Sequence, residues 1–382
     1  MEDIFINAYS SISALGSNIE EMFANALKKD ADFLTIDENI IKGTPFYFGK
    51  IKTPLKPISD EKYALRCNSI LLNCLEQIEP EVQNAIKTCG KDRIGVVIGT
   101  TNSGVDEFEK SGDIDHSQIG NPAGFLHKYL GLSGYYSGVS TACTSGIKAF
   151  STAQKLLENN VCDAVIAGAC DALCKMPVFG FHSLEVLSGS PSIPFSKNRN
   201  GINIGEGGAL FLLEKVKKPH SIKLCATGET SDAYHCATPD PYGVQASKAI
   251  EIALKNAKLT PQQIDYINLH GTGTQSNDLM EANAVFRVFG ASVAASSTKS
   301  LTGHCLGASA GVESALCCAM LDLRINQGKN LLPHRFDGFY DDSLPEISLV
   351  KYGQKSNRLE HILCNAFGFG GSNAVAIFGR IE

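Results

Sequence analysis

The sequence lacks a CxxC pair, a run of 18 apolar residues and an excess of basic charge. Without CxxC pairs, a structural zinc site of the usual cysteine spacing is excluded, and we expect no bound metal. Without a long apolar run, no membrane-spanning helix is expected. A net charge of −6 argues against a nucleic-acid-binding protein, which would usually carry a basic patch. The N-terminal stretch MEDIFINAYS also lacks the basic start of a signal peptide.

Cysteine and glycine, in contrast, are abundant. The 382 residues include 13 cysteines and 36 glycines. An odd number of cysteines in a chain without a secretion signal predicts reduced thiols and a cytoplasmic location. Most of the cysteines are expected to be small buried hydrophobic residues.

Short apolar segments alternate with helix-like segments along the chain, which predicts an α/β fold with covered sheets. The charged stretch LLEKVKKPHSIKL, at about 212–224, is the best internal boundary and divides the chain into 1–217 and 218–382. Strands are predicted at 93–100, 135–141, 163–172, 264–274, 361–371 and 373–379. Helices are predicted at 61–79, 145–158, 245–257, 279–289 and 305–324.

Cys143 differs from the other cysteines in its surroundings. It lies in VSTACTSGIKAF, where a predicted strand leads through small residues into an amphipathic helix. Backbone N–H groups and the positive end of the helix dipole meet at a helix start, and both favour a thiolate. The pattern predicts a nucleophilic thiol at this turn.

Three further segments carry candidate partners for that thiol. NLHGTGTQSND places His270 at the end of an apolar strand, before two glycines. STKSLTGHCLGASAGVESA carries Lys299 and His304 among small residues, with Glu313 on the following helix as a possible partner of the lysine. The glycine-rich loop NAFGFGGSNA exposes backbone N–H groups that can form an oxyanion hole. Its Phe367 and Phe369 are candidates to close a pocket.

TACTSG, HGTGT, KSLTGH and NAFGFGGSNA, in this order, resemble the condensing β-ketoacyl-ACP synthases of the elongating class. PFSKNRNGINIGEGGALFLLE resembles a further signature of the same family. The resemblance covers nearly the whole chain and implies a thiolase fold, in which two similar α/β halves form five αβαβα layers. It also implies an acyltransferase that joins a Cys-bound acyl group to malonyl-ACP by decarboxylative Claisen condensation.

The resemblance also implies a role for each matching residue. Cys143 is expected to accept the acyl group, with His270 and His304 completing a Cys-His-His triad that binds the malonyl thioester carbonyl. Lys299, paired with Glu313, is expected to orient the site electrostatically. Phe369 is expected to be catalytic: its backbone N–H and that of Cys143 would form the oxyanion hole, and its side chain would act as the gate. The expected substrate-binding residues are Thr272 and Thr274, which would hydrogen-bond the phosphopantetheine arm, together with Glu313, Phe367, Gly368 and Gly370.

The implied partners are an acyl carrier protein and a second subunit, either an identical copy or a sister synthase-like chain. The carrier protein supplies the phosphopantetheine, so no bound organic cofactor is expected. Lys62 and Arg66 are candidates for a basic docking patch, although a solvated helix face is the simpler interpretation of both. Segments such as RCNSILLNCLEQI and NPAGFLHKYLGLSG resemble the ketosynthases of aryl-polyene gene clusters.

Three alternatives share the implied fold, and fold alone does not separate them. A thiolase-type acyltransferase would use a second catalytic cysteine where this chain has KSLTGH. A priming synthase would need asparagine in place of His304. A catalytically silent subunit of the chain-length-factor type usually lacks the nucleophile, whereas Cys143 is present here.

Overall fold

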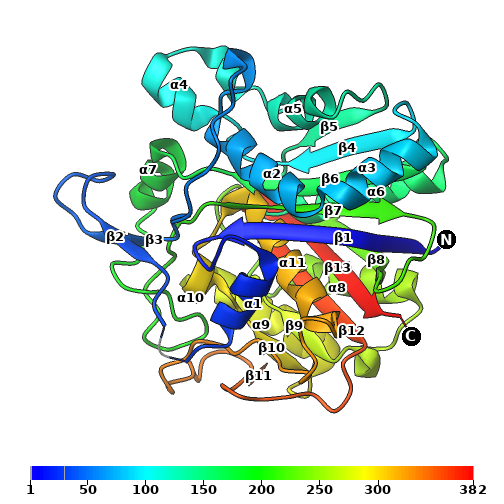
Figure 1. The fold of residues 1–382 in the computed structure, drawn as a ribbon. Helices are drawn as coiled ribbons and strands as arrows, with labels where there is room; N and C mark the ends of the chain where they lie inside the picture. The colour runs from blue at the N-terminus through cyan, green and yellow to red at the C-terminus, as the bar shows by residue number, and fades with distance from the viewer. Residues whose placement is uncertain (1, 30, 382) are drawn as a thin grey trace.

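The computed structural model describes residues 2–29 and 31–381. Its main strands form two mixed sheets of five and six strands, which are joined edge to edge into one continuous sheet of 11 strands (Figure 1). The first sheet has the order β5-β4-β6-β7-β1, and the second has the order β10-β9-β12-β13-β8, with β11 added at its outer edge. The first sheet consists of β1 (Ile4–Ser13), β4 (Ile94–Gly99), β5 (Tyr136–Val139), β6 (Ala164–Asp171) and β7 (Gly207–Glu214). The second consists of β8 (Ile222–Ser231), β9 (Tyr266–Asn268), β10 (Ala294–Ser296), β11 (Ser348–Leu349), β12 (His361–Gly368) and β13 (Ser372–Arg380).

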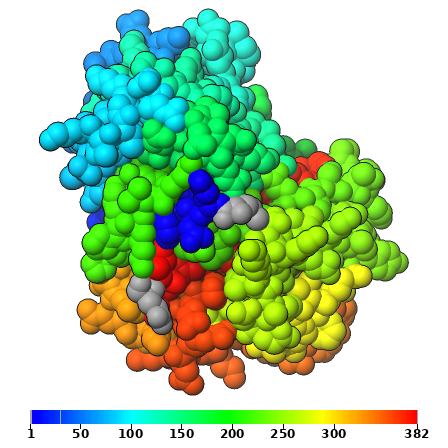
Figure 2. Space-filling view, turned by 90° about the vertical axis from the view of Figure 1, so that its right-hand side faces the viewer, coloured from blue at the N-terminus to red at the C-terminus, as the bar shows by residue number. Residues whose placement is uncertain are grey.

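The two sheets repeat one topology. In the first sheet, β4 lies between β5 and β6 and is parallel to both, and β6, β7 and β1 then follow as antiparallel neighbours. In the second sheet, β9 lies in the same way between β10 and β12, and β12, β13 and β8 follow as antiparallel neighbours. Antiparallel pairing of β1 with β8, from Ile4 opposite Leu224 to Ile6 opposite Ile222, joins the sheets. The loop 215–221, where the sequence places the division between halves, separates β7 from β8. In Figure 2 the N-terminal residues lie at the junction of the two halves.

Three large hydrophobic cores lie between the layers in the described part of the chain, and side-chain alternation along the strands directs neighbouring residues into different cores. Val97 points into the central core, whereas its neighbours Val96 and Ile98 point into the outer core of the first sheet. The central core lies around α6 (Ser145–Glu158) and α11 (Ser309–Leu321), between the sheets. The outer cores lie under α2 (Arg66–Gln77), α3 (Glu79–Cys89) and α5 (Asn121–Tyr129), and under α8 (Val244–Ala257) and α9 (Gln275–Phe289). The predicted five-layered αβαβα arrangement is thereby confirmed.

Smaller elements surround this body. A two-stranded sheet of β2 (Thr35–Asp37) and β3 (Phe46–Phe48) lies beside the first half, as Figure 1 shows. The remaining helices are α1 (Ile19–Ala26), α4 (Val105–Ser111), α7 (Lys175–Ser183) and the single turn α10 (Lys299–Thr302). Among the residues that the structure describes, no helix has both the length and the apolar character needed to cross a membrane.

Several predicted element bounds were wrong. The helix predicted at 61–79 is a 3-10 turn at Glu61–Tyr63 followed by α2, because Leu65 adopts extended backbone angles between them. The strand predicted at 264–274 ends at Asn268, and the helix predicted at 305–324 begins only at Ser309. Several elements had no predicted counterpart, namely the strands β1, β2, β3, β7, β8, β10 and β11 and the helices α1, α3, α4, α5, α7 and α10. Residues 269–274 and 304–308 leave regular structure because they form the site described next.

Candidate active site

Cys143 lies in the turn between β5 and α6, directly before the N-cap residue Thr144. Ala142 has a φ of 55°, in the left-handed region, and this reverses the chain sharply. The Ser145 hydroxyl closes the turn by donating to the Ala142 carbonyl at 2.6 Å and accepting the Thr141 N–H at 2.9 Å. The predicted strand–turn–helix setting is therefore present, and the thiol is buried at the helix start.

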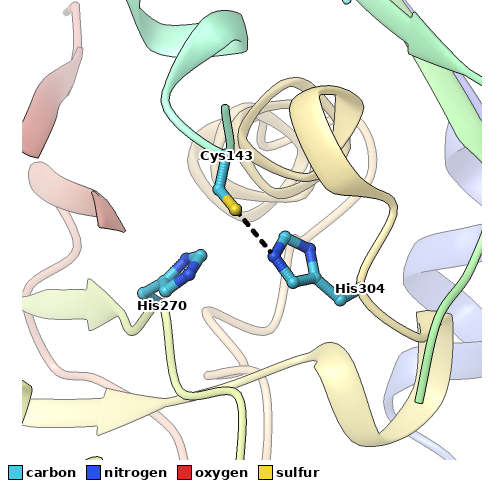
Figure 3. Close-up of side chains that lie close together, drawn as sticks. All are labelled: Cys143, His270 and His304. Atoms are coloured by element: carbon cyan, nitrogen blue, oxygen red, sulfur yellow. Dashed lines mark hydrogen bonds between the residues drawn. The ribbon is translucent and has the colours of Figure 1, made fainter. Parts of the chain in front are cut away.

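His304 lies next to the thiol, with Nε2 at 3.0 Å from Cys143 Sγ (Figure 3). Its other nitrogen, Nδ1, faces the backbone N–H of Leu306 at 3.1 Å and the Ser309 hydroxyl at 2.7 Å. A backbone N–H can only donate, so Nδ1 is an acceptor and the ring proton of neutral His304 is on Nε2. Leu306 takes a φ of 54° to place its N–H there. This requirement explains why the helix begins later than predicted.

His270 enters the same space from the loop after β9 and meets the His304 ring edge-to-face, with centroids 5.2 Å apart. Its Nδ1 is 3.3 Å from the Lys299 ammonium, which is also a pure donor. The proton of neutral His270 is therefore on Nε2 as well. One ligand-type atom each from Cys143, His270 and His304 lie within 4.8 Å of one another. Figure 3 shows both rings directed towards the sulfur.

Both imidazoles are neutral at physiological pH. Burial, followed by the positive charge of Lys299 and by His304, holds the pKa of His270 well below its usual range. Burial and Lys299 do the same to the pKa of His304. The site therefore presents two neutral N–H donors beside one sulfur atom.

A metal ion does not fit these three side chains, although cysteine and histidine are common zinc ligands. A neutral imidazole that binds a metal through Nε2 must carry its proton on Nδ1. In His304, a proton on Nδ1 would point at the N–H donor of Leu306, and in His270 it would point at the ammonium donor of Lys299. The hydrogen bonds behind the rings therefore favour donation from Nε2 over metal binding.

Lys299 and Glu313 form the predicted ion pair, with Nζ 2.5 Å from Oε1 and both side chains almost fully buried. The same ammonium donates to the His270 carbonyl at 2.5 Å. Burial raises the pKa of Glu313 to about 7, against the lowering effect of Lys299. Neither side chain of this pair lines the cavity. Lys299 acts on the site through its direct contacts with His270.

A cavity of about 870 Å³, including its open mouth, leads from the surface to Cys143. Apart from Lys299 and Glu313, the other predicted site residues line it: His270, Thr272, Thr274, His304, Phe367, Gly368, Phe369 and Gly370. The hydroxyls of Thr272 and Thr274 lie 3.0 Å apart along one wall. Phe369, 40% exposed, stacks edge-to-face on Phe181 with ring centroids 5.3 Å apart. Both rings of this pair line the cavity.

Sequence reasoning missed several residues of this site. Glu281, buried on α9, accepts the backbone N–H groups of His270 and Gly271 at 2.7 and 2.6 Å and so fixes the loop that carries the histidine. Phe181 on α7 and Asp232 after β8 also line the cavity. The spacing of Glu281 within its helix carries no signal of this role, because its partners are backbone groups of a distant loop.

Two expectations need correction. A low-pKa thiol was expected from the helix start, but burial raises the pKa of Cys143 to about 11. Lys299 and the backbone N–H groups of Phe369 and Cys143 act in the opposite direction without overcoming it.

Arg66 was a candidate for a basic docking patch, but its guanidinium pairs with buried Glu206 at 2.6 and 2.7 Å. Arg66 therefore compensates the buried charge of Glu206 and stabilises the fold.

Alkylation of Cys143 by iodoacetamide is expected to accelerate as pH rises, without a plateau below about pH 10. With a pKa of about 11, the thiolate fraction increases roughly tenfold for each pH unit below that value. The measurement is the alkylation rate of the Cys143 peptide by mass spectrometry from pH 6 to 10. Exposed Cys236, followed in the same digest, controls for reagent reactivity. A plateau at Cys143 near pH 7 would show that the helix start and Lys299 outweigh burial.

A thiolase fold with a cysteine and two imidazole donors around one cavity defines a condensing acyltransferase. Models of known families match both halves: beta-ketoacyl synthase, N-terminal domain, over residues 70–218, and beta-ketoacyl synthase, C-terminal domain, over 222–327. The chain belongs to the beta-ketoacyl synthase family.

Relatives agree with this assignment along the whole chain. The 3-oxoacyl-[acyl-carrier-protein] synthase 2 of Staphylococcus aureus is 28% identical, over 99% of this chain and 98% of the relative. The enzyme of the same name from Coxiella burnetii is 30% identical over 76% of each chain. A ketosynthase from Xenorhabdus doucetiae, solved in complex with its chain length factor, is 35% identical, with a TM-score of 0.92 and coverage of 100% and 98%. The predicted fold class and β-ketoacyl synthase activity are confirmed.

Proposed function

We propose that this enzyme holds an acyl group on Cys143 and condenses it with malonyl-ACP to give β-ketoacyl-ACP. The observation that carries the proposal is the convergence of two neutral Nε2–H donors, from His270 and His304, on the Cys143 sulfur. In this scheme the chain needs no cofactor of its own, because the carrier protein brings the phosphopantetheine and decarboxylation supplies the carbanion.

The first step is acyl transfer to the enzyme. Cys143 attacks the thioester carbonyl of acyl-ACP, and the backbone N–H groups of Cys143 and Phe369 stabilise the tetrahedral oxyanion. The phosphopantetheine thiol leaves and takes the proton that Cys143 loses. The Thr272 and Thr274 hydroxyls, at the cavity wall, hydrogen-bond the phosphopantetheine arm.

The second step is decarboxylative condensation. Malonyl-ACP places its thioester oxygen between the two Nε2–H donors, which stabilise the enolate formed as CO2 departs. The enolate carbon attacks the acyl carbonyl on Cys143, and the Cys143 thiolate leaves and takes up a proton from water, which restores the thiol. Because both donors are neutral, they stabilise the developing charge without first losing or gaining a proton.

Replacing Cys143 with glutamine is expected to block condensation while preserving decarboxylation of malonyl-ACP. The glutamine amide occupies the place of the acylated thiol, and the enolate site formed by His270 and His304 remains intact. Release of labelled CO2 from malonyl-ACP measures this half-reaction. Further replacement of His304 with alanine should lower the rate by roughly 10²- to 10³-fold, the cost of losing an oxyanion donor.

His220→Ala, at an exposed position in the loop between the halves, is the matched control and should leave CO2 release unchanged. A folded Cys143→Gln variant that binds malonyl-ACP and releases no CO2 would refute the proposed roles of the two histidines.

We further propose a sister synthase-like subunit as the partner and an unsaturated, aryl-primed chain as the acyl group. The Xenorhabdus doucetiae relative, solved with its chain length factor, supports the first proposal, and the sequence segments that resemble aryl-polyene ketosynthases support the second. Native mass spectrometry of the chain co-expressed with a genomic neighbour of the same fold tests the partner. A stable homodimer that excludes the neighbour would contradict it. The cytoplasmic location remains a prediction.

The alternative of a catalytically silent subunit is disfavoured because Cys143, His270 and His304 meet in one accessible cavity. A subunit that only shapes a partner's pocket has no use for this arrangement. Acyl loading of the isolated chain discriminates between the two functions.

A further inference from the structure

A buried carboxylate, that of Asp171, lies close to the turn that follows His304. Asp171 is the last residue of β6 and is fully buried. No lysine, arginine or histidine within residues 2–29 and 31–381 forms a salt bridge with it. A buried carboxylate without a cation is costly unless hydrogen bonds satisfy it.

Five donors from two separate segments satisfy this carboxylate. Oδ1 accepts the Thr100 hydroxyl at 2.7 Å and the backbone N–H groups of Thr101 and Asn102, each at 2.9 Å. Oδ2 accepts the Thr101 hydroxyl at 2.9 Å, the Thr101 N–H at 3.2 Å and the Ala308 N–H at 3.2 Å. Oδ1 therefore holds the loop after β4, and Oδ2 also holds the turn after His304.

The contact with Ala308 is linked to His304 through the backbone of the 306–308 turn. Ala308 follows Leu306, whose N–H fixes Nδ1 of His304 as an acceptor and so keeps the proton on Nε2. The turn is tightly fitted at this point, because a Cβ on Gly307 would lie 2.8 Å from Asp171 Oδ2. The position of the Leu306 N–H is thus supported two residues further on, where the Ala308 N–H is shared between the Cys305 carbonyl at 3.0 Å and Asp171 Oδ2 at 3.2 Å.

We propose that Asp171 is a positioning residue for the condensation: it anchors the 306–308 turn so that His304 presents Nε2–H to the enolate oxygen. This inference rests on the proposed role of His304. Asp171 contacts neither the sulfur nor the substrate cavity. Apart from the minor raising effect of its charge on the pKa of Cys143, its influence passes through the turn.

Replacing Asp171 with asparagine tests this role selectively. An amide oxygen in the place of Oδ1 keeps its three donors from Thr100, Thr101 and Asn102. The amide NH2 then lies where Oδ2 was and faces the Ala308 N–H, so two donors oppose each other. The Thr101 hydroxyl can turn to Asn102 Oδ1, which lies 2.7 Å away. The main loss therefore falls on the turn that carries His304.

The expected signature is a loss of kcat in one half-reaction only. In the Cys143→Gln background, Asp171→Asn should lower the kcat of malonyl-ACP decarboxylation roughly 10- to 100-fold, as misplacement of a catalytic group does, with little change in KM. In the chain that retains Cys143, the same change should leave acyl loading nearly unaffected, because loading uses the Cys143 and Phe369 N–H groups. Gly307→Ala, which displaces the same contact from the other side, should reproduce this pattern.

Asp163→Asn, an exposed change just before the same strand, is the matched control and should alter neither half-reaction. Unchanged decarboxylation in folded Asp171→Asn, or equal loss of loading and decarboxylation together with a lower melting temperature, would overturn the inference. If Asp171→Asn does not fold, Gly307→Ala decides by the same criteria. An inactive Cys143→Gln parent would refute the proposed function itself, and with it this inference.

Discussion

Replacing Cys143 with serine is expected to abolish formation of β-ketoacyl-ACP, lowering kcat by several orders of magnitude, as removal of a nucleophile from a catalytic triad does. A serine hydroxyl is a weaker nucleophile than the thiol and a much poorer leaving group when the enolate displaces it. The hydroxyl occupies less space, so the fold should be unaffected. The assay is product formation from acyl-ACP and malonyl-ACP, followed by mass spectrometry of the carrier protein.

Cys305→Ser is the matched control. Cys305 is also buried and lies next to His304 in sequence, but its sulfur donates to the Glu206 carbonyl and does not line the cavity. Its serine variant should therefore keep most of the activity. Full activity of Cys143→Ser, or equal loss in both variants, would contradict the assignment of the nucleophile.

Replacing Lys299 with alanine is expected to cause the second largest effect, on both activity and stability. The change removes the ammonium that holds His270 through its carbonyl and Nδ1, so condensation should fall mainly in kcat. It also leaves Glu313 buried without its cation. Breaking a buried ion pair costs about 3–5 kcal/mol of unfolding free energy. Denaturant unfolding at pH 8 measures the loss.

The stability loss should depend on pH in a defined direction. The pKa of Glu313 in the folded protein is about 7, above its usual value, and removing Lys299 raises it further. The folded variant then binds a proton that the unfolded chain releases, so its stability falls as pH rises above about 5. The difference from the unaltered protein should therefore be small at pH 6 and grow towards pH 9.

Two variants distinguish the effect of leaving Glu313 buried without a cation from the effect of simply removing a lysine. Lys299→Ala/Glu313→Gln should recover much of the stability, because the buried charge is gone, but not the activity. Lys56→Ala, which breaks an exposed pair with Glu76, should leave the unfolding free energy nearly unchanged. An unaltered unfolding free energy for Lys299→Ala at pH 8 would contradict the account of the pair.

The identity of the reactive side chains could be predicted from the sequence because each stands in a short local pattern. Cys143 lies between a strand and a helix, and the small residues around it are visible in the sequence. Lys299 could be paired with Glu313 because a lysine among small residues needs a charged partner. The resemblance to condensing enzymes then supplied the roles.

The electrostatics of the site could not be predicted in the same way. The expected thiolate at the helix start ignored burial, which comes from residues far away in the chain and raises the pKa of Cys143. The tautomer of His304 depends on a left-handed Leu306, which no propensity predicts. Glu281 and Asp171 hold the loops that carry His270 and His304. Both accept hydrogen bonds from backbone groups of distant loops, so their spacing in the sequence does not reveal this role.

The fold was predicted in outline, with errors where strands depart from simple patterns. β1 contains buried serines, such as Ser10 and Ser11, which weaken its apolar signal. β7 was recognised only as part of a family signature, and β8 alternates buried and half-buried residues beside the expected boundary. The predicted strand at 264–274 was too long because the Glu281 carboxylate draws the backbone of His270 and Gly271 out of the sheet.

The most direct test of the central claim is intact-mass analysis of the protein mixed with a panel of acyl-ACPs, followed by peptide mapping. The panel includes saturated and aryl-primed unsaturated chains. The account predicts a mass increase of one acyl group, located on the peptide that contains Cys143 and absent from Cys143→Ser. Acylation of another residue with Cys143 unmodified, or no acylation by any member of the panel, would contradict it.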